Sequence, residues 1–428
     1  MKRGLGLCVG LGTLLAGSVA FAQQALSSNE VTIGYSGLPY KTSGESNTGI
    51  QVSDTLLLHA GVGAEAGYDT NVYYDPTKPI GSSIFRVMPF VELTNGTRSG
   101  PVRTQFVFDA RAGLQYRHYG NSAIRSEYAD AWNPNAGLSL SWGGAQFAFG
   151  VADVFARIED PPYASGGMPQ TGAIQRTNNQ ASLEGRWSPG GGRLTGTLRY
   201  TNMVDVYDGS YAYADAVTNT LMLDASWRWL PKTAVFLNVQ QGYVDYYNTS
   251  APGHKPNAYP FVASVGLRGL LTEKTSLSLA LGYNNPFYTS GGSTTGFLGS
   301  TYANLALTIL PTQLSRIVIG ARHDFLNVVI SNFAYEDAVY ASYVQQLIGR
   351  LALDLSGRYS HLNYGGAFVD PTQQGRVDNY VQLGATLDYF LRNWVYLGVG
   401  YALIDNNSNL SANDYLKQQV FARLGVTY

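Results

Sequence analysis

The sequence predicts an all-β fold, namely a transmembrane antiparallel up-and-down β-barrel of about 18 strands. Three observations predict it. Apolar and polar side chains alternate at period two along most of the chain, short and long links alternate between the expected strands, and the chain ends on an aromatic residue. Successive side chains of a strand point to opposite faces, so such a strand can present one face to lipid and the other to a polar interior.

The alternation is clear between residues 376 and 389. Leu383 and Leu387 fall on one face of this segment, whereas Asp378 and Gln382 fall on the other. Strands of a soluble β-sandwich can also alternate between apolar and polar residues, because one face of each sheet is buried and the other is exposed to solvent. A sandwich does not explain the regular succession of short and long links, so a barrel is favoured.

The links give both the strand number and the orientation, because short turns of outer-membrane barrels face the periplasm and long loops face outward. Short links are expected at 95–98, 143–144, 189–192, 231–232, 272–274, 311–312, 348–349 and 392–393. Long links are expected at about 69–82, 118–134, 158–175, 206–217, 246–258, 286–297, 326–334, 363–375 and 406–413. An even number of strands returns both chain ends to the periplasm.

Aromatic residues mark the two ends of the expected strands. Tryptophans lie beside the short links, and tyrosines lie near the opposite strand ends, as two girdles at the membrane interfaces would. The tryptophans are Trp142, Trp187, Trp227, Trp229 and Trp394. The terminal Tyr428 resembles the last-strand signal that the barrel-assembly machinery reads.

Composition excludes other classes of protein. Glycine (49) and tyrosine (31) are abundant, only 13% of residues are charged, and the formal net charge is -1. The mean hydropathy of -0.08 argues against an α-helical membrane protein. No basic run supports nucleic-acid binding. The only cysteine is Cys8, so the chain beyond it is expected to have no disulfide and no cysteine-ligated metal.

Three segments are expected along the chain. Residues 1–22 have the pattern of a secretory signal peptide, with a charged start, an apolar run and a small-x-small cleavage site at Ala20-Phe21-Ala22. Residues 23–53 are polar and predict a periplasmic leader. Residues 54–428 are expected to form the barrel, located in the outer membrane of a Gram-negative bacterium and surrounded by lipid and lipopolysaccharide.

The polar face of the expected strands is rich in arginine. An excess of arginine over acid on a pore wall would concentrate anions. The candidate pore-lining residues are Arg86, Arg103, Asp109, Arg111, Arg117, Arg199, Arg228, Arg316, Arg322 and Arg358. The alternative is that arginines and acids of neighbouring strands pair and brace the wall. An anion path fits Arg103, Arg111 and Arg117 best, since only Asp109 accompanies them on one strand face.

The outer links are rich in tyrosine beside Asp and Asn, which could hold sugar rings by stacking and hydrogen bonding. The candidates for sugar contact are Tyr207, Tyr211, Tyr213, Tyr246 and Tyr247. Tyrosine is also a common residue in the loops of barrels, so this hypothesis has a structural alternative. None of the five histidines lies in a nucleophile-elbow or HExxH pattern. We therefore expect no catalytic residue, no metal site and no cofactor.

One region resembles a known family. Residues 61–73 include Gly67-Tyr68-Asp69-Thr70-Asn71, and Val87-Met88-Pro89 follows in the next expected strand. These two motifs resemble those of the β-barrel porin type 2 family, in which a Gly-aromatic-Asp-x-Asn stretch ends the first strand and a Val-x-Pro pattern follows in the next. The resemblance covers about residues 54–120 and is only architectural beyond them. It implies a barrel, and several members of the family are encoded with exopolysaccharide synthesis operons.

These observations give one leading hypothesis and two alternatives. The leading hypothesis is an outer-membrane channel that takes part in exopolysaccharide export, working with a separate periplasmic polysaccharide-export protein. One alternative is a diffusion porin for small solutes, which would include anions and would carry an inward-folded loop. The other is a structural barrel that anchors a machine spanning the envelope.

Overall fold

The computed structural model describes residues 49–95, 106–124, 130–144, 146–160, 174–249, 253–289, 301–392 and 394–428. The expected signal peptide, most of the expected leader and Arg103 lie outside these residues. So do most of the links expected at 95–98, 158–175 and 286–297, and part of the link expected at 118–134.

The described residues form 19 strands. The first ten are β1 (Ile50–Ser53), β2 (Leu56–Asp69), β3 (Ser82–Thr94), β4 (Phe106–Tyr119), β5 (Asp130–Gly143), β6 (Phe147–Asp160), β7 (Ile174–Trp187), β8 (Leu194–Tyr207), β9 (Ala216–Leu230) and β10 (Thr233–Asp245). The others are β11 (Phe261–Thr272), β12 (Thr275–Asn285), β13 (Thr301–Ile309), β14 (Ser315–Asn327), β15 (Ser331–Ile348), β16 (Leu351–Phe368), β17 (Val377–Arg392), β18 (Val395–Ser408) and β19 (Tyr415–Thr427).

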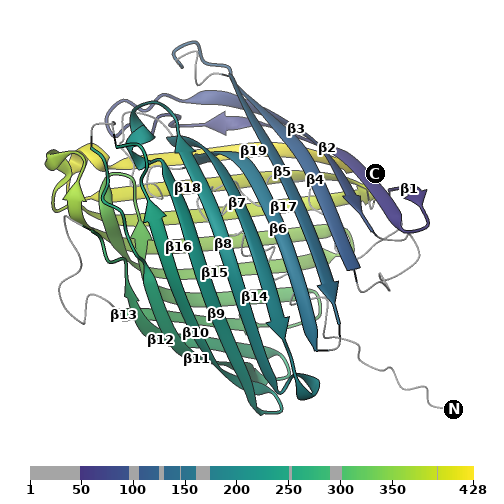
Figure 1. The fold of residues 1–428 in the computed structure, drawn as a ribbon. Helices are drawn as coiled ribbons and strands as arrows, with labels where there is room; N and C mark the ends of the chain where they lie inside the picture. Colours follow the sequence, from purple (N-terminus) through teal and green to yellow (C-terminus); the bar gives the residue numbers. More distant parts are fainter. Residues whose placement is uncertain are drawn as a thin grey trace.

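Strands β2 to β19 form one closed barrel (Figure 1). Each strand pairs antiparallel with the next, and β19 pairs with β2 from Gln419 opposite Asp69 to Thr427 opposite Gly61. The predicted all-β fold of 18 membrane strands is thereby confirmed. Closure leaves no unpaired strand edge, which is the condition for a sheet to lie in lipid.

The short strand β1 adds a hairpin at the end of the seam between β19 and β2. Ile50 and Gln51 pair with Leu58 and Leu57 of β2, on the part of β2 that β19 does not reach. Beside it, Tyr428 exchanges two backbone hydrogen bonds with Ala60. The last residues of the expected leader thus pair with the barrel.

One expected long link is much shorter in the structure. The sequence places an outer link at about 326–334, but β14 ends at Asn327 and β15 begins at Ser331. The reason is that residues from Ser331 onward pair with β16, with Ser331 opposite Phe368. Strands β15 and β16 each have 18 residues, and only three residues join β14 to β15.

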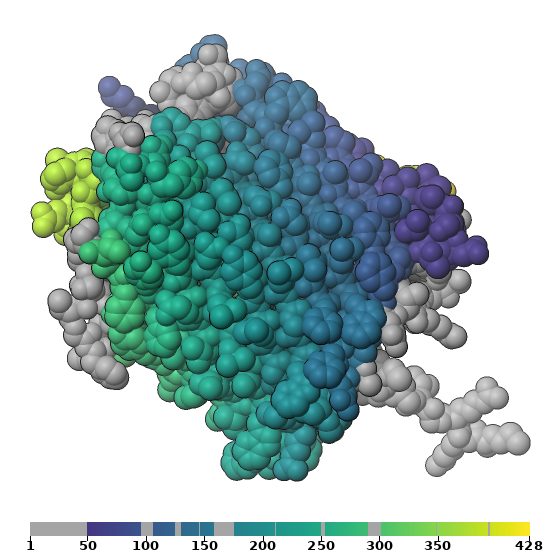
Figure 2. All heavy atoms as spheres, viewed as in Figure 1, coloured from purple at the N-terminus to yellow at the C-terminus, as the bar shows by residue number. Residues whose placement is uncertain are grey.

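The outward face of the barrel is apolar with aromatic residues at both ends. Beside the short links, the exposed rings include Trp142, Trp187, Trp227, Trp229, Tyr389 and Trp394. Near the opposite strand ends, the exposed rings include Tyr68, Trp132, Tyr200, Tyr243 and Tyr359. Side chains of neighbouring strands form a continuous surface on the face that Figure 2 shows. Among the described residues, no helix has the length and apolar character needed to cross a membrane.

These features decide where the barrel lies. Lipid offers no hydrogen-bond partners, so a closed sheet with an apolar outer band and two aromatic girdles matches a bilayer. Closed antiparallel barrels of an even number of strands are typical of outer membranes. The protein is a β-barrel of the Gram-negative outer membrane.

Candidate functional site

The inner wall of the barrel carries charges that are mostly paired. Arg86 on β3 donates to Glu65 on β2 at 3.1 Å, with both side chains buried. Arg199 on β8 donates through Nε to Glu184 on β7 at 2.8 Å. Arg322 and Arg358 form ion pairs with Asp324 and Glu336. Four of the ten pore-lining candidates therefore brace the wall.

Three further ion pairs, which were not among the candidates, are buried. Arg376 contacts Asp378 at 2.6 Å, Lys417 contacts Asp69 at 2.9 Å, and Arg423 donates through Nε to Asp388 at 2.8 Å. Removing one partner of a buried pair leaves a charge without compensation, at a cost of about 3–5 kcal/mol. These pairs thus fix side-chain positions on the wall between β16 and β2.

The strand predicted to suit an anion best does not present open arginines. Arg103 lies outside the described residues. Arg117 is only 3% exposed, and its guanidinium lies over the Tyr119 ring at 4.9 Å. Arg111 is half-buried and lies opposite Glu92 in the register of β3 and β4. Asp109 is also half-buried and lies opposite Thr94.

Arg228 and Arg316 differ from the other candidates because both are exposed. They lie near the short links, at the end of β9 and the start of β14. Among the residues that the structure describes, no carboxylate oxygen lies within salt-bridge distance of either guanidinium. The open basic groups are therefore at the periplasmic end of the wall.

At the outer end, loops from distant strands meet around the turn between β14 and β15. Val329 in this turn packs against Tyr211, Tyr213 and Ala214 of the β8–β9 loop. Strands β9 and β15 are six positions apart, roughly 29 Å along the wall at about 4.8 Å per strand. A contact between their ends requires the loops to reach across the mouth. We call residues 327–332 and the loops that hold them the outer clasp.

Lys255 of the β10–β11 loop secures the outer clasp. Its Nζ donates to Asn327 Oδ1 and to the carbonyl oxygen of Val328, both at 2.7 Å, and lies 4.7 Å from the centre of the Tyr246 ring. Tyr246 also donates to Asn327 Oδ1 at 2.9 Å. Burial lowers the pKa of Lys255 to about 7, since water no longer solvates the ammonium.

The loops that flank the β14–β15 turn add to the outer clasp. Val369 of the β16–β17 loop donates its backbone N–H to the carbonyl oxygen of Ile330 at 2.9 Å. Tyr288 of the β12–β13 loop donates its hydroxyl to the carbonyl oxygen of Asn332. Backbone groups of the turn are thus satisfied by other loops, as buried backbone groups must be.

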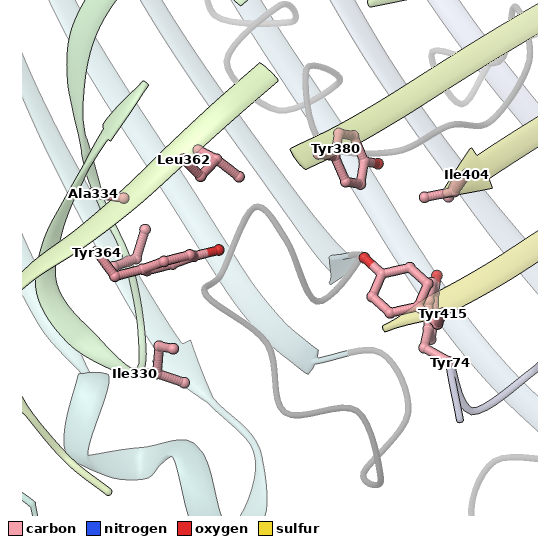
Figure 3. Close-up of a cluster of buried hydrophobic side chains, with 9 residues drawn as sticks. Tyr74, Ile330, Ala334, Leu362, Tyr364, Tyr380, Ile404 and Tyr415 are labelled. Carbon is pink, nitrogen blue, oxygen red and sulfur yellow. The ribbon is translucent and has the colours of Figure 1, made fainter. Parts of the chain in front are cut away.

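A buried cluster continues from the outer clasp along the wall (Figure 3). It joins Val328 and Ile330 of the turn with Tyr74 of the β2–β3 loop and with side chains of β15 to β19. The wall residues are Ala334, Leu362, Tyr364, Tyr380, Ile404 and Tyr415. Apolar and aromatic groups inside the mouth of a barrel narrow the space that water and solutes can occupy.

Tyr74 is held inside the mouth in an uncommon backbone conformation. Its φ is 57°, a region that bulky residues rarely adopt. The Tyr74 ring meets the Tyr415 ring edge-on at 5.3 Å, and Lys417 Nζ lies 4.0 Å from its centre. Asn71 ties the same loop to β19 by donating to the carbonyl oxygen of Leu416 at 3.2 Å. The β2–β3 loop therefore folds inward.

The tyrosines predicted to contact sugars divide into two groups. Tyr211, Tyr213 and Tyr246 are buried, so their ring faces serve packing between loops and are not open to a solute. This corrects the sequence expectation, which could not include contacts between loops. Tyr207 is partly buried beside the same cluster, and Tyr247 is 45% exposed.

Tyr247 borders a cavity of about 570 Å³ at the outer mouth. Asp245, His254 and Asn257 also line it, and Asn257 Nδ2 donates to Asp245 Oδ1 at 2.9 Å. An open ring beside carboxylate, amide and imidazole groups can stack on a sugar and bond its hydroxyls. No three His, Cys, Asp or Glu side chains in the described part of the chain are grouped to hold a metal ion.

No family model matches the sequence, and no curated protein matches it. The resemblance to the β-barrel porin type 2 family therefore stays a prediction. Several solved structures are similar in fold. OccAB4 from Acinetobacter baumannii has a TM-score of 0.46 and 12% identity over 87% of this chain and 98% of its own.

Two siderophore receptors are similar to the same degree. A variant of the ferric enterobactin receptor PfeA from Pseudomonas aeruginosa, in complex with enterobactin, has a TM-score of 0.44 and 9% identity, over 87% of this chain and 81% of its own. The receptor PirA from Acinetobacter baumannii has a TM-score of 0.42 and 9% identity, over 89% of this chain and 81% of its own. Similarity at this level is weak, and the fold follows from the strand pairing itself.

Proposed function

We propose that this outer-membrane barrel is a channel for a polar saccharide solute, and that it takes part in exopolysaccharide export. The observation that carries the proposal is the inner wall, which is polar and charged around a closed barrel of 18 membrane strands. A barrel of this size encloses an aqueous space unless it is plugged. A polar wall inside an apolar shell is what a hydrophilic solute needs to cross lipid.

Two further observations support a saccharide. The cavity beside Tyr247 combines an open aromatic ring with Asp245, His254 and Asn257, the groups that hold sugars in many proteins. The family that residues 54–120 resemble includes members encoded with exopolysaccharide operons. In this proposal the partners are a separate periplasmic polysaccharide-export protein, lipopolysaccharide around the barrel, and the barrel-assembly machinery that inserts it.

The direct test is a clean deletion of the gene, followed by separate measurement of surface carbohydrate and of carbohydrate retained in the periplasm. We expect one surface polymer to fall at least tenfold while its material accumulates in the periplasm, and complementation to reverse both changes. Unchanged amounts of every surface polymer would show that export does not depend on this barrel.

The outer clasp favours a second candidate function, a diffusion porin for small solutes. A loop that crosses the mouth narrows a channel, and Val329 bridges loops that are far apart on the wall. Liposome swelling with neutral sugars of increasing length separates the two functions. A porin should admit mono- and disaccharides at a steady rate and exclude longer chains, and its deletion should leave surface polymers unchanged.

A further inference from the structure

Inside the barrel, most of the basic groups of the outer half are paired with acids, whereas several of those at the periplasmic end are not. In the outer half, each of the following basic groups has an acidic partner: Arg86, Arg176, Arg322, Arg358, Arg376 and Lys417. These pairs largely cancel the field of the outer half. The periplasmic end of the wall has a different composition.

Five arginines lie at the periplasmic end of the barrel, three of them on strands and two in the turns, and we call them the basic arc. They are Arg186 on β7, Arg193 before β8, Arg228 on β9, Arg316 on β14 and Arg350 before β16. Four of them are exposed and Arg186 is half-buried. Among the described residues, none of the five has a carboxylate within salt-bridge distance. Arg350 donates only to the carbonyl oxygen of Leu391, at 3.4 Å.

Strand parity places the three strand arginines of the basic arc, Arg186, Arg228 and Arg316, inside the barrel. Side chains an even number of residues apart on a strand share a face. Arg186 shares its face with Glu184, which pairs with Arg199 across the wall. Arg228 shares its face with Asp224, which accepts from Arg268 at 3.0 Å.

The same reasoning applies to Arg316, which lies an even number of residues from Arg322 on β14, and Arg322 is paired on the inner wall. Arg350 lies in the turn between β15 and β16, and Arg193 in the turn before β8. Arg193 accepts the backbone N–H of Arg228 at its carbonyl oxygen, at 2.8 Å, so these two members are neighbours across strands β8 and β9.

Few acids lie near the periplasmic end on the strands that carry the basic arc, and of these Glu184 is paired with Arg199 and Asp224 with Arg268. Elsewhere on the wall, Glu92 and Asp109 lie near the periplasmic ends of β3 and β4, where Glu92 faces Arg111. Glu273 is exposed in the β11–β12 turn, and Asp354 lies further along β16, opposite Val344 and Thr386. A surplus of cations in a mouth with low-dielectric walls raises the local concentration of anions. Guanidinium groups also bind carboxylates with two parallel hydrogen bonds.

We propose that the basic arc is the entry site for an anionic saccharide that carries carboxylate groups and arrives from the periplasm. This rests on the proposed channel function and names its substrate class. Arginines spread over β7 to β16 suit a chain with repeated charges, because several weak contacts made together bind more tightly than one. The inward direction of Arg186, Arg228 and Arg316 suits a solute that enters the lumen better than a protein that docks on the turns.

The experiment is block of single-channel current by sugars in planar bilayers, with the purified barrel inserted in a known orientation. The probes are an oligogalacturonate and a neutral maltooligosaccharide of equal length, added to one side at a time. We expect the acidic probe to block from the periplasmic side at a concentration at least tenfold lower than from the outer side. The neutral probe should show no such difference, and added salt should weaken the acidic block.

Variants assign the effect to the basic arc. Arg193→Gln, Arg228→Gln and Arg316→Gln together should raise the blocking concentration of oligogalacturonate about tenfold and leave that of the neutral probe unchanged. Arg228→Gln and Lys78→Gln form a matched pair that each remove one positive charge, and Lys78 is exposed in the outer β2–β3 loop. Only Arg228→Gln should weaken the periplasmic block. The gel shift on heating confirms that each variant is folded.

The outcomes separate the two proposals. A barrel that conducts, but is blocked equally by both probes or equally from both sides, overturns the anionic-saccharide entry site and leaves the channel intact. Equal block by inorganic phosphate and oligogalacturonate at equal charge would mean that the arc binds simple anions, which contradicts a saccharide site. A folded barrel that conducts no ions contradicts the channel function and the entry site together.

Discussion

A single lysine makes the outer clasp sensitive to pH. Burial lowers the pKa of Lys255 to about 7 from an ordinary value of 10.5, whereas in an opened loop the ammonium regains water and its ordinary value. The open state therefore binds more protons than the closed state between about pH 7 and 10.5. Rising pH stabilises the closed clasp across that window, and below about pH 7 both states carry the proton.

We therefore expect the channel to open less often at pH 9 than at pH 7.5, several-fold by single-channel recording. Tyr246 has the opposite dependence, because burial raises its pKa in the closed clasp, but its effect begins only near the ordinary phenol pKa of 10.0. Lys255→Met should remove most of this pH dependence. An unchanged pH response in Lys255→Met would show that another group controls opening.

Gly425 illustrates how the inner wall depends on single atoms. A Cβ built at Gly425 would lie 2.0 Å from Cε1 of the buried Tyr396 ring, so Tyr396 occupies the space that any other residue would need. Overpacking of this kind costs about 1–3 kcal/mol. Gly425→Ala should lower the temperature at which the barrel loses its folded gel mobility. Gly196→Ala is the control, since a Cβ there meets no atom within 4 Å and should change little.

At the scale of elements, the β14–β15 turn is the part that closes the mouth. Val329 is 3% exposed, and a carboxylate at this position would be buried without a partner. Val329→Asp should therefore release the turn from the β8–β9 loop and raise single-channel conductance at least twofold. The membrane strands keep their pairing, so the unfolding temperature should stay the same. Ala412→Asp, in the exposed β18–β19 loop, should change neither quantity, and equal conductance in both variants would contradict the outer clasp.

The strands and their orientation could be predicted from the sequence because both depend on local patterns. Alternation fixes which face of a strand meets lipid, and the outward positions of Trp187 and Trp394 confirm it. The burial of Tyr213 could not be predicted, since it depends on contact between loops more than 100 residues apart. The burial of Lys255 could not be predicted from the sequence either, because a lone lysine in a polar link is usually solvated.

Arginine counts alone could not reveal which guanidinium groups are open. Pairing depends on strand register, which places Arg86 opposite Glu65 and leaves Arg228 opposite Ala234. Both are inward arginines in similar polar contexts of the sequence. The register, and not the pattern of each strand, therefore decides whether an arginine braces the wall or faces the solute.

At the scale of the whole molecule, closure joins the two ends of the barrel sequence. Strand β19 pairs with β2, so the barrel closes only when these two strands meet. Tyr428 directly follows β19, is 54% exposed on the outer face and exchanges two backbone hydrogen bonds with Ala60. Its place suits both recognition by the assembly machinery and the final step of closure.

Deleting Tyr428 should therefore reduce the amount of assembled barrel more than it changes the stability of the barrels that do form. We expect at least a fivefold loss of the heat-modifiable form in outer-membrane fractions, with unfolded chain accumulating in the periplasm. Tyr389→Ala is the matched control, because Tyr389 is a similarly exposed aromatic ring (45%) of the periplasmic girdle within β17. It should keep near-normal amounts. Equal losses in the two variants would assign Tyr428 to the girdle alone and remove its role as an assembly signal.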